Sequence, residues 1–584
     1  MDILRDSPLG QIIRFLTGCR YLLYPEEQPE FTCLHTKKFN TVVPHQPSFE
    51  RHVKYNFARP ANPSSVGPQV PILGGLGGNA NAEHPQVLAH QHGQRYEEAL
   101  PEYEHGIILV DWYTETDAQN PQNWSTLKKS LVTALLWLYT FTVYCASAIY
   151  TPSIEGVMNE YGVDHTISSL GLSLYVLGYG VGPLLFSPLS EIPRIGRNAP
   201  YIITLFLYVL MAIPTALTRS FPGFLVLRFL TGFLGSPCLA TGGATLQDMY
   251  PPLKLPYGYT AWVGATFCAP ALGPFISAFA VSAGGWRWSL WEVLWMSIFT
   301  FVIMFVFFPE TSATTILFHR ARRIRKRLHD TRFVCQSEMD EANTSLRQIV
   351  ADALIRPLQI TLLDLAVFFT NFYSSYSYGV YYSYFEAFPL VYTEMYGFNL
   401  GLTGASFLSI VVACLIGTLI YLIYIYWYLE PKITAHGPGP QEERLIPAIF
   451  AAFLQPIGLF LFAWSSRQSV HWIVSMIGIF FFSTGGFILF QGKKAYHHEC
   501  KARIFMYLPL SYPRYAASLF AANDFFRSVW AAGAVLYARP LFETLGIDRG
   551  VSLLAGLSCG GVLGVSALYV YGARLRARSK FAET

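Results

Sequence analysis

The chain has 584 residues, of which 52% are hydrophobic, 16% aromatic and only 13% charged, and its mean hydropathy is +0.33. Soluble domains carry about a quarter charged residues and disordered chains carry few aromatic ones, so both classes are excluded. The net charge of +4 gives no support for nucleic-acid binding. This composition indicates a membrane protein.

The first part of the chain differs from the rest. Residues 1–129 are rich in His, Pro, Gly, Asn and Gln and contain no apolar run long enough to cross a bilayer, so we expect a cytoplasmic, largely disordered tail. Residues 1–27 lack the pattern of a cleaved secretory signal, and we expect no leader. Residues 11–16 and 21–23 have an amphipathic pattern, which a helix on the membrane surface and a helix docked onto the protein explain equally well.

From residue 130 onward, apolar segments recur at about twenty residues, the length that a helix needs to cross about 30 Å of hydrocarbon. They predict an all-α polytopic membrane protein with twelve transmembrane helices, at 130–150, 167–188, 200–217, 223–244, 257–280, 288–308, 360–384, 403–427, 446–464, 472–491, 515–538 and 550–572. Six spans, a polar joint and six more spans are typical of a transporter built from two related halves. The expected units are an N-terminal six-helix bundle at 130–308, a cytoplasmic central loop at 309–357, a C-terminal six-helix bundle at 358–572 and a cytoplasmic tail at 573–584.

The joint contains a basic cluster at residues 319–327, which the positive-inside rule assigns to the cytoplasm. The other basic clusters fall on the same side, so both termini are predicted to lie inside. The sequons at Asn123 and Asn343 would then face the cytosol, and we expect no glycosylation. We expect the basic cluster to serve topology and contact with anionic lipid rather than regulation.

Several residues of the first half are candidates for proton coupling and conformational change. Arg228 lies inside an apolar span, where an unpaired charge costs several kcal/mol, so it must face a partner or a wet cavity; an inert ion pair is the alternative. The loop at 182–198 places Glu191 and Arg197 at the cytoplasmic surface, where an ion pair could lock one conformation. Span five contains a pattern that bends a helix and lets a neighbour approach closely, formed by Gly264, Pro270, Gly273 and Pro274.

Spans seven and eleven supply the candidates for a substrate path. Span seven carries Asn371 and a tyrosine-rich run with Tyr378 and Tyr382, and ends near Glu386. Aromatic faces can stack on a solute, and a carboxylate can take a proton or attract a cation, although helix packing also explains the tyrosines. In span eleven, Asp524 and Arg527 are three residues apart, which fits a local ion pair as well as a place in the path.

Other function classes are excluded by what the sequence lacks. No GxxxxGK[ST] loop is present, so an ATP-driven pump has no support and the energy must come from a gradient. The polar loops contain no nucleophile with a base or metal ligands at usable spacing, so we expect no enzyme. The nine cysteines include no CxxC pair, and the run His-His-Glu-Cys at 497–500 points its side chains in different directions, so neither a disulfide framework nor a metal site is expected.

Several motifs together are similar to those of a known family, at residues 120–124, 148–152, 182–198, 225–235, 269–274, 286–288, 309–311 and 512–518. The chain resembles the major facilitator superfamily and, within it, the fungal twelve-span drug:proton antiporters of the benomyl and methotrexate resistance type. The resemblance implies proton-coupled efflux of drugs, fungicides or secondary metabolites by alternating access, with Arg228 near the proton-coupling step and residues 269–274 favouring antiport. It also implies a monomer in the plasma membrane that uses the proton gradient and no cofactor. A facilitator or importer of a nutrient or polyamine-like solute is the alternative.

The sequence departs from that family in two places. Ala269 stands where the family usually has glycine. Residues 492–503 form an extra charged stretch at the end of span ten. We hypothesise that a retained short intron or another error in the gene model accounts for them, because Gly-Lys can be read from a GGTAAG donor sequence. A transcript that uniformly contains these codons would remove this hypothesis.

Overall fold

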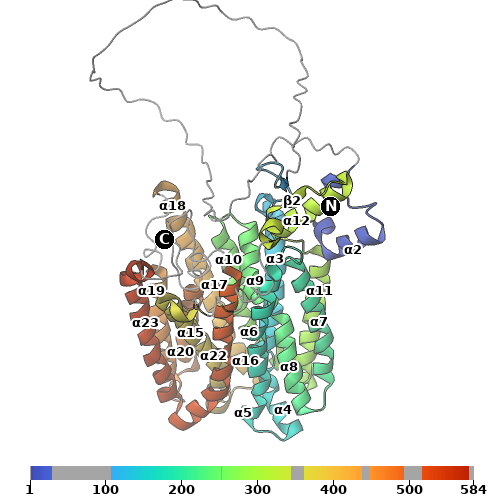
Figure 1. The fold of residues 1–584 in the computed structure, drawn as a ribbon. Helices are drawn as coiled ribbons and strands as arrows, with labels where there is room; N and C mark the ends of the chain where they lie inside the picture. The colour runs from blue at the N-terminus through green and yellow to red at the C-terminus, as the bar shows by residue number, and fades with distance from the viewer. Residues whose placement is uncertain are drawn as a thin grey trace, which may run out of the picture.

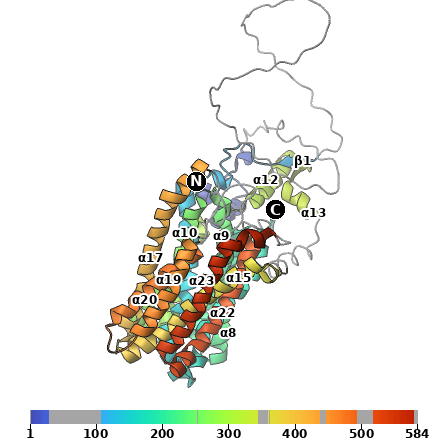
Figure 2. The same ribbon diagram turned by 90° about the vertical axis from the view of Figure 1, so that its left-hand side faces the viewer.

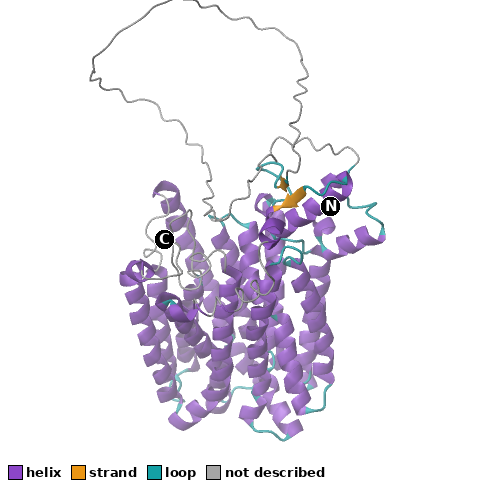
Figure 3. Ribbon diagram, in the orientation of Figure 1, coloured by secondary structure: helices purple, strands orange, loops and turns teal. Residues whose placement is uncertain are grey.

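The computed structural model describes residues 2–28, 107–251, 253–342, 361–436, 446–491 and 516–577, together with residues 355 and 359. Within these ranges the chain is a bundle of long helices that run between two ends (Figures 1 and 3). Helix α12 (Ala313–Leu328) lies beyond one end, which we call the α12 end, and we call the opposite one the far end. The turned view in Figure 2 shows α12 beyond the same end of the bundle.

Ten of the described helical segments are long and apolar enough to cross a membrane: Thr126–Tyr161, His165–Glu191, Asn198–Leu217, Phe221–Met249, Leu255–Gly284, Trp288–Phe307, Leu400–Lys432, Ile446–Ser465, Trp472–Phe490 and Ile547–Tyr571. Each coincides with a predicted span, so the all-α membrane fold is confirmed. Helices α15 (Leu365–Phe388) and α22 (Ala516–Leu545) occupy the places of spans seven and eleven in the same bundle, but their sequences are more polar. That α15 and α22 also cross the membrane, which would make twelve spans, stays a prediction.

The first half of the bundle contains α3 (Thr126–Ala148), α6 (Leu170–Glu191), α7 (Asn198–Leu217), α8 (Phe221–Gly235), α9 (Pro237–Met249), α10 (Leu255–Gly284) and α11 (Trp288–Phe307). The second half contains α15, α16 (Leu400–Ser406), α17 (Leu408–Ile423), α18 (Glu430–His436), α19 (Ile446–Ser465), α20 (Trp472–Phe490), α22 and α23 (Ile547–Ala577). The halves meet where α6 and α9 pack against α22 and where α10 packs against α16 and α17. Any central site must therefore be built from these helices and α3 and α15 beside them.

A small structure that the sequence did not predict covers the α12 end. Strand β1 (Ile108–Val110) pairs in parallel with β2 (Phe333–Cys335), with Ile108 opposite Phe333. Val110 and Phe333 are buried against the apolar face of α12, which contributes Ala321 and Ile324. The central loop and the segment before span one thus fold together.

The start of the chain docks onto α11 and α12. Helices α1 (Asp2–Asp6) and α2 (Pro8–Leu16) contact α11, and Glu26 is buried between Arg320 and Arg323, at 3.1 and 3.4 Å. Of the two alternatives for this segment, docking onto the protein is therefore observed, while Phe15 and Leu16 stay 85% and 75% exposed. Residues 29–106 of the predicted tail, Asn343, the extra stretch at 492–503 and most of the motif at 512–518 lie outside the described residues.

Candidate functional site

Tyrosine hydroxyl groups join the two halves at the middle of the bundle. The Tyr179 hydroxyl on α6 lies 2.9 Å from the hydroxyls of both Tyr378 and Tyr382 on α15. Tyr382 also contacts the Ser147 hydroxyl of α3 at 3.0 Å. All three tyrosines are at most 1% exposed. The predicted Tyr378 and Tyr382 are therefore brought together, and with Tyr179 and Ser147 they form what we call the central cluster.

Tyr179 was missed by the sequence reasoning, although its neighbours carry a signal. It lies between Gly178 and Gly180, and a side chain at either glycine would collide with a neighbour, with the α8 backbone at Gly178 and with Ser528 of α22 at Gly180. The two glycines that flank Tyr179 thus let α6 pack closely against α8 of its own half and α22 of the other half, as small residues do at helix interfaces in membranes.

Asp524 and Arg527 form the expected ion pair on α22, and Arg527 also contacts the first half of the bundle. Arg527 Nη2 donates to the Tyr144 hydroxyl of α3 at 2.8 Å, and its guanidinium lies 4.5 Å from the centre of the Tyr378 ring. The pair is buried, and the second oxygen of Asp524, Oδ2, has no hydrogen-bond partner among the described residues. A buried carboxylate oxygen without a donor is a candidate for binding a proton or a cationic group.

Arg228 lies directly behind the central cluster. Its side chain is buried, and it donates from Nε to the Gly171 carbonyl at 2.8 Å, and from Nη1 and Nη2 to the carbonyls of Ala146 and Ser147 at 3.2 and 3.3 Å. Helix α3 ends at Ala148, so these two carbonyls lack donors within their helix, and a cation is favourable there. Within the described part of the chain, the partners of Arg228 are carbonyls and the rings of Tyr150 and Tyr175 rather than the carboxylate of an ion pair.

The other two candidates of span seven lie away from the centre. Asn371 accepts from Asn523 Nδ2 at 2.6 Å and donates to Thr361 Oγ1 at 3.1 Å, all within the second half. Glu386 lies nearer the far end, where it accepts from the Ser169 hydroxyl at 3.0 Å and lies 3.6 Å from His165 Nδ1. Glu386 therefore joins the halves beside the far end, while Asn371 does not bridge them.

Helix α10 makes the predicted close approach at one of the two glycines in the predicted pattern, Gly273 and not Gly264. A Cβ atom at Gly273 would lie 2.8 Å from Ile149 N and 2.9 Å from Cys145 O, so the α3 backbone occupies that space. A Cβ at Gly264 would have nothing within 4 Å. Pro270 and Pro274 are buried inside α10, and α16 approaches the Pro274 carbonyl through Gly404. Residues 270–274 of α10 thus lie where this helix packs against α3 of its own half and α16 of the other half.

At the α12 end, the ion pair expected for Arg197 has a different partner. Arg197 Nε lies 3.2 Å from Asp248 Oδ2 of α9, and its Nη1 donates to the Ser190 hydroxyl at 2.9 Å. Glu191 is exposed and acts on Arg197 through its charge. Burial would lower the pKa of Arg197, but Asp248 and Glu191 outweigh it and raise that pKa. Since Asp248 belongs to the same half, this pair does not lock the halves together.

An ion pair that links the halves at this end was not predicted. Lys254 Nζ, just before α10, lies 2.6 Å from Glu430 Oε1, and the Tyr257 hydroxyl donates to Glu430 Oε2 at 2.8 Å. Glu430 begins α18 in the second half. No local pattern could have paired two charges that are 176 residues apart in the chain.

Comparisons with known proteins agree with this architecture. The family model of the Major Facilitator Superfamily matches residues 136–535. The chain is 39% identical to the MFS-type transporter pyvG of Aspergillus violaceofuscus and 34% identical to the cycloheximide resistance protein of Candida maltosa, over 99% of both chains in each case. It is 36% identical to fluconazole resistance protein 1 of Saccharomyces cerevisiae, over 81% of this chain and 85% of that one.

Among solved structures, the proton:xylose symporter XylE bound to a bromodeoxyglucose has a similar fold. It superposes with a TM-score of 0.52 over 77% of this chain and 96% of its own, at 12% identity. At this identity the likeness concerns the fold alone, and it confirms the expected arrangement of membrane helices.

Proposed function

The chain belongs to the Major Facilitator Superfamily, and on this premise we propose that it exports small organic molecules such as drugs, fungicides or secondary metabolites in exchange for protons. It is a membrane transporter and not an enzyme. Relatives whose names record resistance to cycloheximide and fluconazole support toxic organic compounds as cargo. The alternative, import of a nutrient, has no such support.

The observation that carries the proposal is the central cluster between the halves. Alternating access requires the halves to separate at one end and then at the other. The hydroxyl contacts of Tyr179, Tyr378 and Tyr382 are neutral hydrogen bonds, each with a net contribution of about 0.5–1.5 kcal/mol, so a solute or water can replace them at low cost. The exposed ring faces would then contact an apolar or cationic solute.

Asp524 is our candidate for the proton site. Its carboxylate pairs with Arg527, which in turn holds Tyr144 of the other half. Protonation of Asp524 would weaken that ion pair and free Arg527 to change partners across the interface. Arg228 fixes the end of α3 beside Ser147, and so keeps the first half's side of the cluster in place.

We further propose that the α12 end faces the cytoplasm, because the basic residues of α12 and the residues before α3 gather there. Export then means that cargo enters from the α12 end and leaves at the far end. We propose the plasma membrane as the location, a monomer as the working form, and the proton gradient as the energy source with no cofactor.

Yeast cells that lack their own drug exporters test this function. They would express the chain, Asp524→Asn and, as a matched control at the far end, Asp548→Asn, and efflux of a panel of fluorescent drugs would be measured with and without a protonophore. We expect efflux that stops with the protonophore and in Asp524→Asn but persists in Asp548→Asn. Efflux that continues without a proton gradient would contradict proton coupling, and uptake down a gradient would indicate an importer.

A further inference from the structure

A pocket of about 670 Å³ lies at the α12 end, between α2, α12 and the start of α7. Its cationic wall is formed by α12, with Arg322 and Lys326 beside His319. Another part of its lining is apolar and includes Ile195, Ile202 and Ile203. A cavity with one cationic and one apolar wall suits an amphipathic anion.

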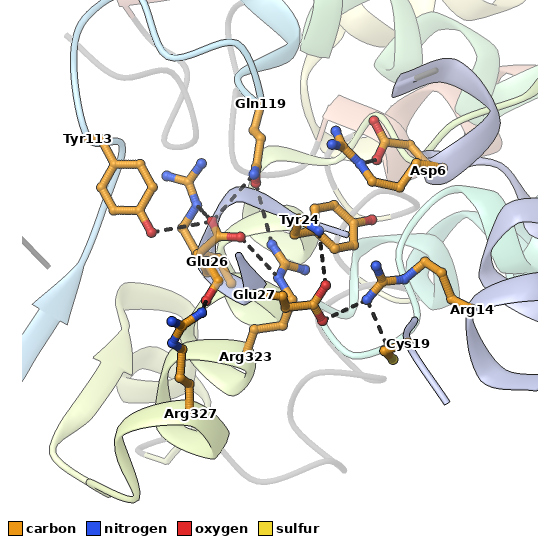
Figure 4. A network of polar contacts seen from close by, with 12 residues as sticks. Asp6, Arg14, Cys19, Tyr24, Glu26, Glu27, Tyr113, Gln119, Arg323 and Arg327 are labelled. Carbon is orange, nitrogen blue, oxygen red and sulfur yellow. Dashed lines mark hydrogen bonds and ion pairs between the residues drawn. The ribbon is translucent and has the colours of Figure 1, made fainter. Parts of the chain in front are cut away.

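The acidic side chains in the pocket already have partners within the protein. Glu27 lies 2.7 Å from Arg14 Nη2 and accepts the Tyr24 backbone N–H at 2.9 Å, a contact that Figure 4 shows. Burial would raise the pKa of Glu27, but Arg14 and that amide outweigh it and lower the pKa, so Glu27 stays charged and paired. Glu310 accepts four backbone N–H groups, and Asp6 pairs with Arg5 at 3.0 Å. None of these carboxylates forms an ion pair with Arg322 or Lys326.

Most basic residues of α12 are also committed to protein partners. Arg320 pairs with Asp117 at 2.8 Å, and Arg325 pairs with Glu338 at 2.7 Å. Arg327 donates to the carbonyls of Glu26 and Gln28, and Arg323 pairs with Glu26 (Figure 4). The basic cluster is thus mainly a structural element that holds the N-terminal segment.

Arg322 and Lys326 are different. They lie one turn apart on the same face of α12, both are exposed, and neither makes a hydrogen bond or ion pair with a described residue. Two cations in a single cavity, neither paired with a described residue, are what an anionic oxygen group would satisfy.

Exposed apolar side chains beside the pocket point to a lipid rather than a soluble anion. Ile203, in the first turns of α7, is 58% exposed. On α2, Ile12, Phe15 and Leu16 are spaced as one helix face and are 45%, 85% and 75% exposed. Helix α2 lies beside the α12 end of α11 (Figure 1), the end at which the apolar helix α11 stops, at Phe307. An exposed apolar helix face at the end of an apolar span is typical of a helix that lies in the lipid interface.

We propose that this pocket binds the phosphate of an anionic glycerophospholipid from the leaflet at the α12 end. Arg322 and Lys326 hold the headgroup, and the acyl chains lie against Ile203 and the exposed face of α2. Binding would fasten the N-terminal segment to both the membrane and α12. This site does not depend on the direction or the cargo of transport.

Native mass spectrometry of the full-length protein tests the site. The protein would be reconstituted in nanodiscs of phosphatidylcholine with increasing phosphatidylinositol, extracted, and scored for retained phosphatidylinositol. The test variant is Arg322→Gln with Lys326→Gln. The matched control is Arg20→Gln with Arg332→Gln, which removes the same charge at the same end from exposed residues outside the pocket.

We expect the test variant to retain phosphatidylinositol at least fivefold less than the wild type, and the control variant to match the wild type. Phe15→Ser with Leu16→Ser should also weaken retention, whereas inorganic phosphate or soluble glycerophosphoinositol should not displace the lipid. Equal retention in the test and control variants would overturn the proposal. Displacement by the soluble anion would assign the pocket to a water-soluble ligand instead.

Discussion

Replacing Arg228 by lysine tests whether this buried cation acts through its geometry or only through its charge. The guanidinium donates to three carbonyls on two helices, at 2.8, 3.2 and 3.3 Å, from a side chain that is 1% exposed. Hydrogen bonds from a charged donor contribute about 1.5–3 kcal/mol each. An ammonium keeps the charge but reaches one of these carbonyls, because it is a point charge rather than a planar fork.

Arg228→Lys therefore loses about two charge-assisted hydrogen bonds, or about 3–6 kcal/mol. Arg287→Lys is the matched control, because Arg287 also donates to two carbonyls, those of Ala216 and Thr218 at 2.9 Å, but its side chain is 27% exposed and water can replace the lost bonds. For that variant we expect a loss of about 1 kcal/mol or less.

Thermal unfolding of the purified protein, followed by tryptophan fluorescence, measures both variants beside proton-dependent drug efflux in cells. We expect a clear fall in Tm for Arg228→Lys, with efflux below a tenth of the wild-type rate at equal expression, and small changes for Arg287→Lys. Equal falls in Tm for the two variants would refute the reasoning, because burial and the number of carbonyl partners would then not matter.

Three further predictions concern other parts of the molecule. Gly273→Ala should cost about 1–3 kcal/mol and lower the Tm, because its Cβ would lie 2.8 Å from Ile149 N. Gly264→Ala should be neutral or slightly stabilising. Equal changes in Tm for the two variants would contradict the close approach of α10 and α3. Lys254→Glu should raise the ratio of molecules open at the α12 end to molecules closed there by up to about fivefold, since such a partly exposed pair contributes about 0.2–1 kcal/mol. Distances between spin labels on α9 and α22 measure this ratio, and adding Glu430→Lys should restore the wild-type distances. A double variant that fails to restore them would count against the pair. Burial would raise the pKa of Asp117, but Arg320 outweighs burial and lowers that pKa. Asp117 therefore stabilises the docked β1 segment at neutral pH, and this stabilisation is lost as the pH falls through the lowered pKa. Asp117→Asn should therefore speed hydrogen exchange of residues 107–117 at pH 7 but not at a pH below the lowered pKa of Asp117, while Asp111→Asn, at an exposed position, should leave exchange unchanged at both.

The candidate site shows where sequence reasoning succeeds and where it stops. Arg228 could be singled out because a charge in an apolar run is visible in the sequence itself. Its partners could not be found, because carbonyls are present in every residue and only the end of α3 makes two of them available. Similarly, Tyr378 and Tyr382 were recognisable as candidates, but Tyr179, which joins them to the first half, was not.

The charged loop at the α12 end gives a second example. Glu191 was the nearest acid in the sequence to Arg197, yet Asp248 is the group that Arg197 contacts, at 3.2 Å. Nearness along the chain predicts partners only within a helix, where residues three or four apart share a face, as Asp524 and Arg527 do. Between helices, the partner depends on how the bundle packs.

The sequence by itself determined the membrane class, the positions of the spans and the residues that are out of place in an apolar helix, because these follow from hydropathy and from the 1.5 Å rise per residue of a helix. The tertiary structure alone decided which of those residues meet. Glu386 and Tyr382 are four residues apart in one helix, but one lies beside the far end and the other in the central cluster. It also decided that Arg320 holds the N-terminal segment while Arg322 stays free, since partners brought together from distant parts of the chain leave no mark on the local sequence.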